Sequence, residues 1–297
     1  MEECIEILPV SLLDKNRRTV NGLRRLAGSL GLEFGWHYLL DLTWAIARLG
    51  PARGQRLMDA GAGTGVLQWY LAGQGAEVVS VDRMSRSHLP VRFRLRYHVH
   101  GLRPDDLAPT RFTKRLRSGQ TSGFGERLAG SILSQARKNF PRRLDLRKGR
   151  VVIYNQDLKS LEDLPDNSLD AVVAISSLEH NDPADLPLVV AELMRLIKPG
   201  GALLATLGAA CDRDWFHGPS RGWCYTEASL RQLFSLPAQV VSNYDQHDRL
   251  FTELKNCGEL RYNLAEFYYR SGENGMPWGI WEPQYIPVGV CKVKADA

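Results

Sequence analysis

The sequence lacks an apolar run of the roughly 20 residues that a membrane-spanning helix needs. Its first residues, MEECIEILP, are acidic, whereas a secretory signal peptide begins with basic residues. No segment repeats internally, and no segment is of low complexity. These absences argue against a membrane span and a repeat architecture, and we expect a cytoplasmic location.

Cysteine is scarce and is not arranged for metal binding or cross-linking. None of the five cysteines stands in C-x-x-C spacing: they are Cys4, Cys211, Cys224, Cys257 and Cys291. This distribution predicts neither a zinc site nor a disulfide framework, and we expect reduced thiols and no bound metal. Cys224 lies near segments that we assign below to the substrate side, but packing as a small buried residue is the simpler interpretation.

Basic residues are concentrated in one part of the chain. The sequence has 38 lysines and arginines against 33 acids, yet residues 83–150 alone hold 18 of the basic residues and only four acids. Arg92, Arg94 and Arg96 alternate with apolar residues, which predicts either a strand with a charged face or a helix. Such a cluster suits recognition of a phosphate or carboxylate as well as it suits a solvated surface.

The most informative stretch is LMDAGAGTGVLQWYLA, residues 57–72. Apolar residues lead to Asp59, three glycines follow at alternate positions, and apolar residues then recur at helical spacing. The pattern predicts a buried strand, a tight glycine turn and a helix. Glycine permits backbone angles that a Cβ forbids and lets a ligand approach the main chain, while the helix N-terminus offers unpaired N–H groups.

An acid follows where a nucleoside-binding site needs one. The segment EVVSVD predicts a second strand that ends in Asp82, 17 residues after Gly65. A carboxylate there can accept both hydroxyls of a ribose that lies across the carboxyl end of the first strand. The sequence therefore predicts a nucleoside ligand.

The spacing of the glycines and the elements after them indicate a family. A dinucleotide-binding turn has the pattern G-x-G-x-x-G, whereas this chain has acid-x-Gly-x-Gly-x-Gly from Asp59 to Gly65. Two later segments continue the pattern: NQDLKSLEDLPDNSLDAVVAISSLEH, residues 155–180, and LMRLIKPGGALLATL, residues 193–207. In this order, over about 150 residues, they resemble the class I S-adenosylmethionine-dependent methyltransferases.

The resemblance implies an α/β fold: a Rossmann-like sheet of seven mostly parallel strands with an antiparallel last strand, helices on both faces, N-terminal helices and an insertion. The nearly continuous apolar segment at residues 169–177 predicts a buried central strand. QVVSNYDQ and IPVGVCKVKA look like the sixth and seventh strands. We expect the methyltransferase domain to span residues 51–297.

Residues 1–50 are expected to form an N-terminal helical extension, with two helical patterns that end before Gly50 and Pro51. In this family such an extension often closes over the cofactor or borders the substrate. Trp36, His37 and Tyr38 therefore belong either to the substrate pocket or to the packing of the second helix.

Two further additions interrupt the expected domain. Residues 88–150 predict a basic inserted subdomain with a helical apolar period at Leu128, Ile132, Leu133 and Ala136. Residues 247–285 are too long and too aromatic for a bare hairpin loop, and we expect part of them to form a lid or dimer element. A helix is also predicted after Tyr225, with a cap at Thr226 and Ser229.

The cofactor that the resemblance implies is S-adenosyl-L-methionine, whose product is S-adenosyl-L-homocysteine. The backbone of residues 61–63 would hold its methionine moiety, Asp82 its ribose, and Asp157 with Leu158 its adenine, while Asp59 would orient the amino group or the turn. The full set expected to bind the cofactor is Asp59, Gly61, Ala62, Gly63, Gly65, Asp82, Arg83, Asp157, Leu158, Ser176 and Ser177.

Two histidines are candidates for a catalytic base, which only an acceptor that must lose a proton needs. His180 ends the segment SSLEH at the carboxyl end of the predicted fourth strand, although packing beside the cofactor explains it equally well. His217 lies in DRDWFHGPSRGW on the expected acceptor side, and an exposed surface position is its alternative. A magnesium-assisted mechanism is not expected, because only Asn181 and Asp182 follow as potential ligands.

Methyl transfer needs mainly positioning and exclusion of water. The first hypothesis is a methyltransferase that acts on an oxygen or nitrogen of a small molecule, a glycan precursor or a secondary metabolite. Aromatic residues could form its pocket: Trp215, Trp223, Tyr225, Tyr268, Tyr269, Trp278 and Trp281.

Two alternatives compete with this hypothesis. An RNA methyltransferase is favoured by the arginine-rich segment and the isoelectric point of about 9.0, but no Asn-Pro-Pro-Tyr motif is present. A non-catalytic cofactor-binding scaffold is the other alternative, and the intact glycines and acids argue against it. The acceptor and the oligomeric state stay open at this point.

Overall fold

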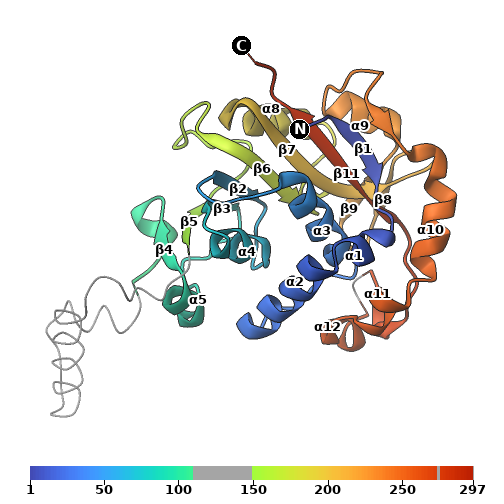
Figure 1. Ribbon diagram of the computed structural model, residues 1–297, viewed down its shortest axis with the longest axis horizontal. Coiled ribbons are helices and arrows are strands. Elements are labelled where there is room, and N and C mark those ends of the chain that lie inside the picture. The colour runs from blue at the N-terminus through green and yellow to red at the C-terminus, as the bar shows by residue number, and fades with distance from the viewer. Residues whose placement is uncertain (110–148, 273–274, 297) are drawn as a thin grey trace, which may run out of the picture.

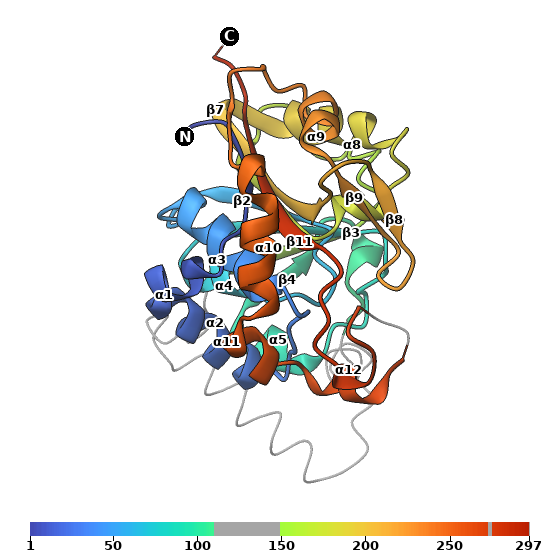
Figure 2. The ribbon, with the colours of Figure 1, turned by 90° about the vertical axis from the view of Figure 1, so that its right-hand side faces the viewer.

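The computed structural model describes residues 1–109, 149–272 and 275–296. A large mixed sheet passes through the middle of this part of the chain, with helices on both faces (Figure 1). Figure 2 shows α3 (Tyr38–Leu49) and α4 (Leu67–Gly73) on one side of the sheet, and α8 (Leu186–Leu196) and α9 (Glu227–Leu233) on the other. This is the α/β fold class expected from the sequence.

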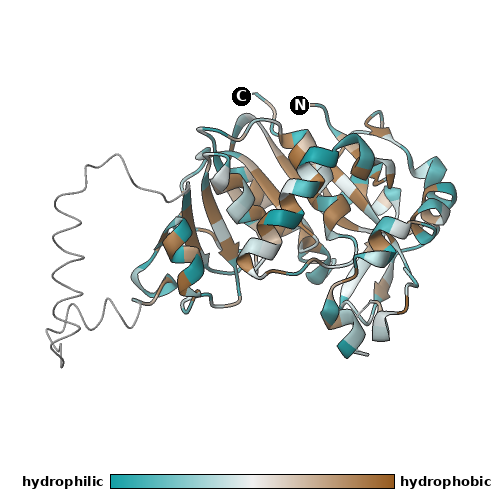
Figure 3. Ribbon diagram, turned by 60° about the horizontal axis from the view of Figure 1, so that its bottom comes forward, coloured by the Kyte–Doolittle hydropathy of each residue, from teal (hydrophilic) through white to brown (hydrophobic). Residues whose placement is uncertain are grey.

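The centre of the sheet has the expected mostly parallel order with an antiparallel strand near the C-terminus. Its strands, in spatial order, are β5 (Arg150–Asn155), β3 (Glu77–Asp82), β2 (Arg56–Ala60), β6 (Leu169–Ile175), β7 (Ile197–Ala209) and β11 (Ile286–Val293). The first five are parallel to one another, and β11 is antiparallel to β7. Because helices cover both faces, these strands are almost continuously apolar, as their brown colour in Figure 3 shows.

The edge beyond β11 differs from the expectation. The predicted sixth strand, QVVSNYDQ, contributes only β10 (Val241–Ser242), and the strand beside β11 is instead β1 (Cys4–Ile7) from the N-terminus. The N-terminal extension therefore begins with a strand, which was not predicted, before its helices. Cys4, Ile5 and Ile7 of this strand are buried, while the Glu6 carboxylate accepts the Trp44 indole N–H of α3 at 2.9 Å.

Further elements complete the described chain, and the sheet has eleven strands there rather than seven. The remaining elements are α1 (Ser11–Lys15), α2 (Arg17–Leu30), α5 (Val91–Arg96), β4 (His98–Gly101), η1 (Pro104–Asp106), η3 (Leu178–His180), β8 (Trp215–His217), β9 (Gly222–Tyr225), η4 (Tyr244–Gln246), α10 (His247–Lys255), α11 (Gly258–Tyr262), α12 (Glu266–Arg270) and η5 (Pro277–Gly279). None of the helices in the described ranges has the length and apolar content to cross a membrane.

The additions to the domain are partly described. Arg92, Arg94 and Arg96 all lie in α5, so the helix is the correct one of the two alternatives and the strand was wrong. The strand β4 follows and pairs in parallel with β5 at the edge of the sheet. The helical period expected after Leu128 lies outside the described residues. Residues 247–285 hold α10, α11, α12 and η5, and Glu259 of α11 is paired with Arg17 and Arg24 of α2.

Candidate active site

The glycine turn connects β2 to α4 and is shaped by the main chain. Gly61 and Gly63 have φ angles of 73° and 47°, which favour glycine, and the N–H groups of Gly61 and Ala62 both donate to the Val81 carbonyl at 2.9 Å. A Cβ on Gly61 would overlap the Ser177 side chain and lie 2.7 Å from its Oγ. Only glycine therefore fits where this turn meets the loop after β6.

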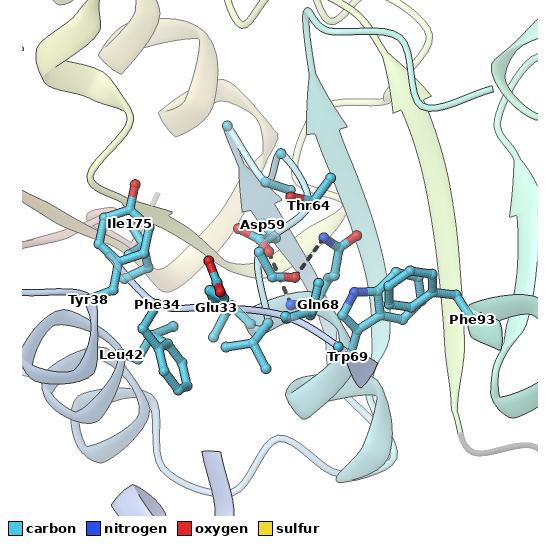
Figure 4. Close-up of a pocket in the computed structure, with 18 of the residues that line it drawn as sticks. Glu33, Phe34, Tyr38, Leu42, Asp59, Thr64, Gln68, Trp69, Phe93 and Ile175 are labelled. Carbon is cyan, nitrogen blue, oxygen red and sulfur yellow. Dashed lines mark hydrogen bonds between the residues drawn. The ribbon is translucent and has the colours of Figure 1, made fainter. Parts of the chain in front are cut away.

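The Asp59 side chain stabilises the glycine turn through a hydrogen bond to the main chain of α4. The side chain is buried, and its Oδ2 accepts the main-chain N–H of Gln68 at 3.1 Å, while the Gln68 amide donates to the Gly65 carbonyl at 3.1 Å (Figure 4). Burial raises the pKa of Asp59 to about 7, although Arg86 acts in the opposite direction. Asp59 thus connects the end of β2 to the first turn of α4.

Asp82 stands at the carboxyl end of β3, oriented by two main-chain donors. Its Oδ2 accepts the Gly63 N–H at 2.7 Å and its Oδ1 accepts the Met84 N–H at 2.7 Å. Each carboxylate oxygen has a second lone pair, which is available to a hydroxyl group. The strand register places Asp82 beside Asn155 of β5, two residues before Asp157, so both predicted acids meet at one edge of the sheet.

A buried cation that the sequence did not single out, Arg86, lies against Ser80 of β3. Arg86 donates to the Ser80 hydroxyl, to the Ser80 carbonyl at 2.7 Å and to the Tyr154 carbonyl at 3.3 Å. Burial lowers its pKa, and Asp82, Asp59 and Asp106 counteract this effect. Arg86 is one of many arginines in its segment, and no pattern in the sequence distinguishes it from the others.

Two pockets meet at the glycine turn. The smaller, of about 260 Å³, is lined by seven of the residues predicted to bind the cofactor. They are Gly61, Asp82, Arg83, Asp157, Leu158, Ser176 and Ser177. His180, Asn181 and Tyr38 complete its lining.

The larger pocket, of about 670 Å³, lies along the other side of the turn and receives the remaining predicted residues, Asp59, Ala62, Gly63 and Gly65. Its walls are largely apolar and aromatic. Figure 4 shows Phe34, Tyr38, Leu42, Trp69 and Phe93 among the residues around it. Trp69 and Phe93 stack with their ring centroids 4.6 Å apart. Tyr38 and Gly61 line both pockets, so the two spaces are neighbours.

The two candidate bases differ in position. His180 is exposed and lines the smaller pocket, and its Nδ1–H donates to the Arg221 carbonyl at 2.9 Å, which leaves Nε2 with the lone pair. His217 lines neither pocket, and only 4% of it is exposed, so the alternative of a surface position was wrong. Burial lowers the pKa of His217, and His37 contributes in the same direction.

Trp36, His37 and Tyr38, at the start of α3, divide between the two roles considered for them, packing and pocket lining. Trp36 and His37 are buried in the core, whereas Tyr38 lines both pockets. Burial raises the pKa of Tyr38, so its hydroxyl stays protonated near neutral pH.

The five cysteines are free thiols, and Cys224 is buried, as the simpler interpretation had it. Among the described residues, Cys211, His247 and Asp248 offer potential metal-ligand atoms within 4.8 Å of one another. None of them lines either pocket.

Comparison with known proteins agrees with the resemblance seen in the sequence. A family model described as a methyltransferase domain matches residues 112–205, a range that contains β5, β6 and the start of β7 through Ala205. Members of this family use S-adenosylmethionine, the cofactor expected from the sequence. A search of curated proteins found no significant match.

Several solved structures are similar to the chain at low sequence identity. A 1,6-didemethyltoxoflavin N1-methyltransferase from Burkholderia thailandensis, with S-adenosylhomocysteine bound, is 14% identical, with a TM-score of 0.44 over 98% of this chain and 88% of that one. The [4+2]-cyclase SpnF is 16% identical, with a TM-score of 0.48 over the full length of both chains. A magnesium protoporphyrin IX methyltransferase from Synechocystis PCC 6803, with bound S-adenosylmethionine, is 14% identical, with a TM-score of 0.39 over 96% and 85%.

Proposed function

We propose that the chain is an S-adenosylmethionine-dependent methyltransferase that moves a methyl group to an oxygen or nitrogen of a small molecule. The observation that carries this proposal is the pair of acids at the ends of β3 and β5, on one side of a turn whose backbone only glycine can form. Asp82 is suited to two ribose hydroxyls, and Asp157 with Leu158 to an adenine, since all three line one pocket.

The residues present fit this cofactor. A Cβ at Gly61 would collide with Ser177, so the absence of a side chain there leaves a cradle of main-chain atoms between the two pockets. S-adenosylmethionine supplies a methyl carbon on a sulfonium. An acceptor lone pair forms the new bond to this carbon while the carbon–sulfur electron pair stays with sulfur. The protein contributes position and a dry environment.

The walls of the larger pocket favour a small acceptor over RNA. Aromatic and aliphatic side chains line it, as in sites for small molecules. The described arginines of the basic segment are largely engaged within the protein. Arg94 donates to the carbonyls of Leu89, Ser87 and Ala108, and Arg96 donates to the Ser29 hydroxyl. This engagement leaves fewer of their N–H groups free to bind a phosphate backbone.

Calorimetry with S-adenosylhomocysteine tests the cofactor assignment. We expect binding to the unaltered protein, a loss of about tenfold or more in affinity for Asp82→Ala, and unchanged affinity for Glu77→Gln at the opposite end of the same strand. An unaltered protein that binds a nicotinamide dinucleotide instead would overturn the proposal. Transfer of labelled methyl groups into a small-molecule extract, with total RNA as the parallel substrate, then separates the two acceptor classes.

A further inference from the structure

One of the three arginines of α5 differs from the other two in its contacts. Arg94 donates to three main-chain carbonyls, and Arg96 donates to the Ser29 hydroxyl. Arg92 has no hydrogen-bond or ion-pair partner in the ranges that the structure describes, although its Cζ lies 5.0 Å from the centre of the Phe93 ring. Its guanidinium N–H groups are therefore available to a ligand.

Arg92 stands at the mouth of the larger pocket. It is exposed, and it lines this pocket together with Phe93 of the same helix. A Cβ on Gly31 would lie 3.9 Å from Arg92 Cζ, so the guanidinium reaches from α5 to the segment between α2 and α3, which lines the pocket as well. An anion that enters there meets a planar cation that binds carboxylates and phosphates through two hydrogen bonds.

The interior of the larger pocket holds a second polar group without a partner. Trp69 is only 1% exposed, and its indole N–H has no acceptor among the described residues. Figure 4 shows the indole nitrogen on the side of Trp69 away from Phe93. A buried donor without a partner costs free energy, and a bound molecule with an acceptor atom would satisfy it.

Aromatic rings line the space that these two polar groups face. Phe34, Tyr38, Phe93 and Phe267 contribute to the lining of the larger pocket, together with Trp69. Such rings stack on flat ring systems or meet them edge to face, so they favour a planar aromatic ligand. The volume of about 670 Å³ is within the range of sites that bury a whole small molecule.

Two acids line the same pocket and restrict where an anion can lie. Asp59 is at the buried end, where it is 2% exposed and accepts the Gln68 N–H. Glu33 is exposed at the mouth, and no described residue pairs with it. An anionic group is disfavoured beside either carboxyl group, so Arg92 is the position that favours it.

We infer that the larger pocket binds the methyl acceptor, and that this acceptor is a planar aromatic molecule with an anionic group, a carboxylate or phosphate, at its exposed end. Arg92 pairs with the anionic group, and the Trp69 N–H donates to a ring nitrogen or carbonyl oxygen at the buried end. The inference rests on the proposed methyltransferase function. Tyr38 and Gly61, which line both pockets, mark the boundary between acceptor and cofactor.

Three ring compounds that differ by one group test the charge and the acceptor atom. Quinoline-6-carboxylate has both, quinoline-6-carboxamide lacks the charge, and naphthalene-2-carboxylate lacks the ring nitrogen. By calorimetry on protein saturated with S-adenosylhomocysteine, we expect the first to bind about tenfold more tightly than the second and about fivefold more tightly than the third. Quinolin-6-yl phosphate in the same assay decides between carboxylate and phosphate. Equal affinity for the carboxylate and the carboxamide, or no binding of any compound at millimolar concentration, would overturn the inference.

Two arginine variants of the same helix locate the charge. Arg92→Gln should remove the preference for the carboxylate over the carboxamide. Arg96→Gln should retain it, because Arg96 is bonded to Ser29 and does not line this pocket. A preference that persists in Arg92→Gln would show that another group binds the anion, and the inference would be wrong.

The Trp69 N–H can be observed directly in protein that is isotope-labelled in its seven tryptophans. We expect its NMR signal, assigned from its absence in Trp69→Phe, to shift when quinoline-6-carboxylate binds. The Trp44 signal should stay, since its N–H is already bonded to Glu6 at 2.9 Å. A ligand that binds without moving the Trp69 signal contradicts the buried contact. If Trp69→Phe does not fold, the naphthalene compound still tests the acceptor atom on the unaltered protein.

The methionine moiety of the cofactor has a carboxylate that competes for the same arginine. Affinity for S-adenosylhomocysteine in Arg92→Gln separates the two assignments: we expect a change of less than about twofold, and a loss of about tenfold would assign Arg92 to the cofactor and refute the inference. An unaltered protein that does not bind S-adenosylhomocysteine counts against the proposed function instead. Binding of the ring compounds without it still reports on the larger pocket.

Discussion

The proposed cofactor side of this protein and a buried cluster of Asp41, His37 and Tyr285, here called the His37 cluster, are held together by different kinds of contact. On the cofactor side, the donors are main-chain N–H groups. Asp82 accepts those of Gly63 and Met84, and Asp59 accepts that of Gln68. In the His37 cluster, side chains bind side chains, as between His37 and Tyr285. Main-chain contacts depend on turn geometry, whereas side-chain contacts depend on where distant segments pack.

The separation of the partners along the chain differs just as clearly. Gly63 and Asp82 are 19 residues apart, and Asp59 and Gln68 are nine apart. His37 and Tyr285 are 248 residues apart. The comparison predicts that changes on the cofactor side alter ligand affinity, while changes in the His37 cluster alter stability and leave cofactor affinity intact.

Gly61→Ala should have the largest effect. The new Cβ would overlap Ser177 at a φ of 73°, so we expect destabilisation of about 3 kcal/mol and loss of measurable S-adenosylhomocysteine binding. Thermal unfolding and calorimetry measure both effects. Gly73→Ala is the matched control: it lies in α4 with nothing within 4 Å, and should raise stability by about 0.5–1 kcal/mol. Equal behaviour of the two variants would contradict the role of the turn.

Asp41→Asn tests the His37 cluster. Replacing the fully buried carboxyl group bonded to His37 should cost about 3 kcal/mol in unfolding free energy, while cofactor affinity changes less than about twofold. Asp14→Asn, which removes an exposed partner of Arg17, should change stability by no more than about 0.5 kcal/mol. A large loss of cofactor affinity in Asp41→Asn would show that the two sides are not separate.

The contribution of Asp59 to the stability of the folded protein should depend on pH. Because burial raises its pKa to about 7 in the folded state, the folded protein binds this proton more tightly than the unfolded chain does. Its contribution to stability is therefore complete below the ordinary pKa near about 4 and is lost as pH rises toward 7. Asp59→Asn should lack this decline. Denaturant unfolding across that pH range measures the difference, and parallel curves for the two proteins would refute the assignment.

Thr226→Ala should have the smallest effect. The Thr226 hydroxyl caps α9 by accepting the Ser229 N–H at 3.3 Å, as the sequence predicted, so its loss should cost about 1 kcal/mol. Thr252→Ala removes a hydroxyl that donates to the Asp248 carbonyl within α10, and should be neutral or slightly stabilising. Chemical denaturation of the two variants gives the comparison.

The cofactor half was largely predictable because each step was local. Asp59 precedes its glycines directly, and Asp82 ends a strand that follows one helix later, so parallel strand order brings the acids together. The structure places all eleven predicted residues around the two pockets. Arg86 was not predicted, because the sequence carries no signal that a single arginine will be buried.

The surroundings of His217 and the strand beside β11 could not be predicted to the same degree. His217 was named as a candidate from its segment, but neither its burial nor its bond to Ser220 has a local signal. Likewise, β1 took the place expected for the sixth strand, because the free edge of β11 pairs with whichever extended segment reaches it with apolar residues on the proper faces.

By itself, the sequence determined the glycine turn, the order of the central parallel strands and the acids at their ends, since periodicity and backbone preference act over a few neighbouring residues. Only the tertiary structure decided which strand borders β11, that Arg86 is buried against Ser80 of β3, and that His37 is bonded to Tyr285 near the other end of the chain. Those outcomes depend on burial and hydrogen bonding between remote segments, which exist only once the chain has packed.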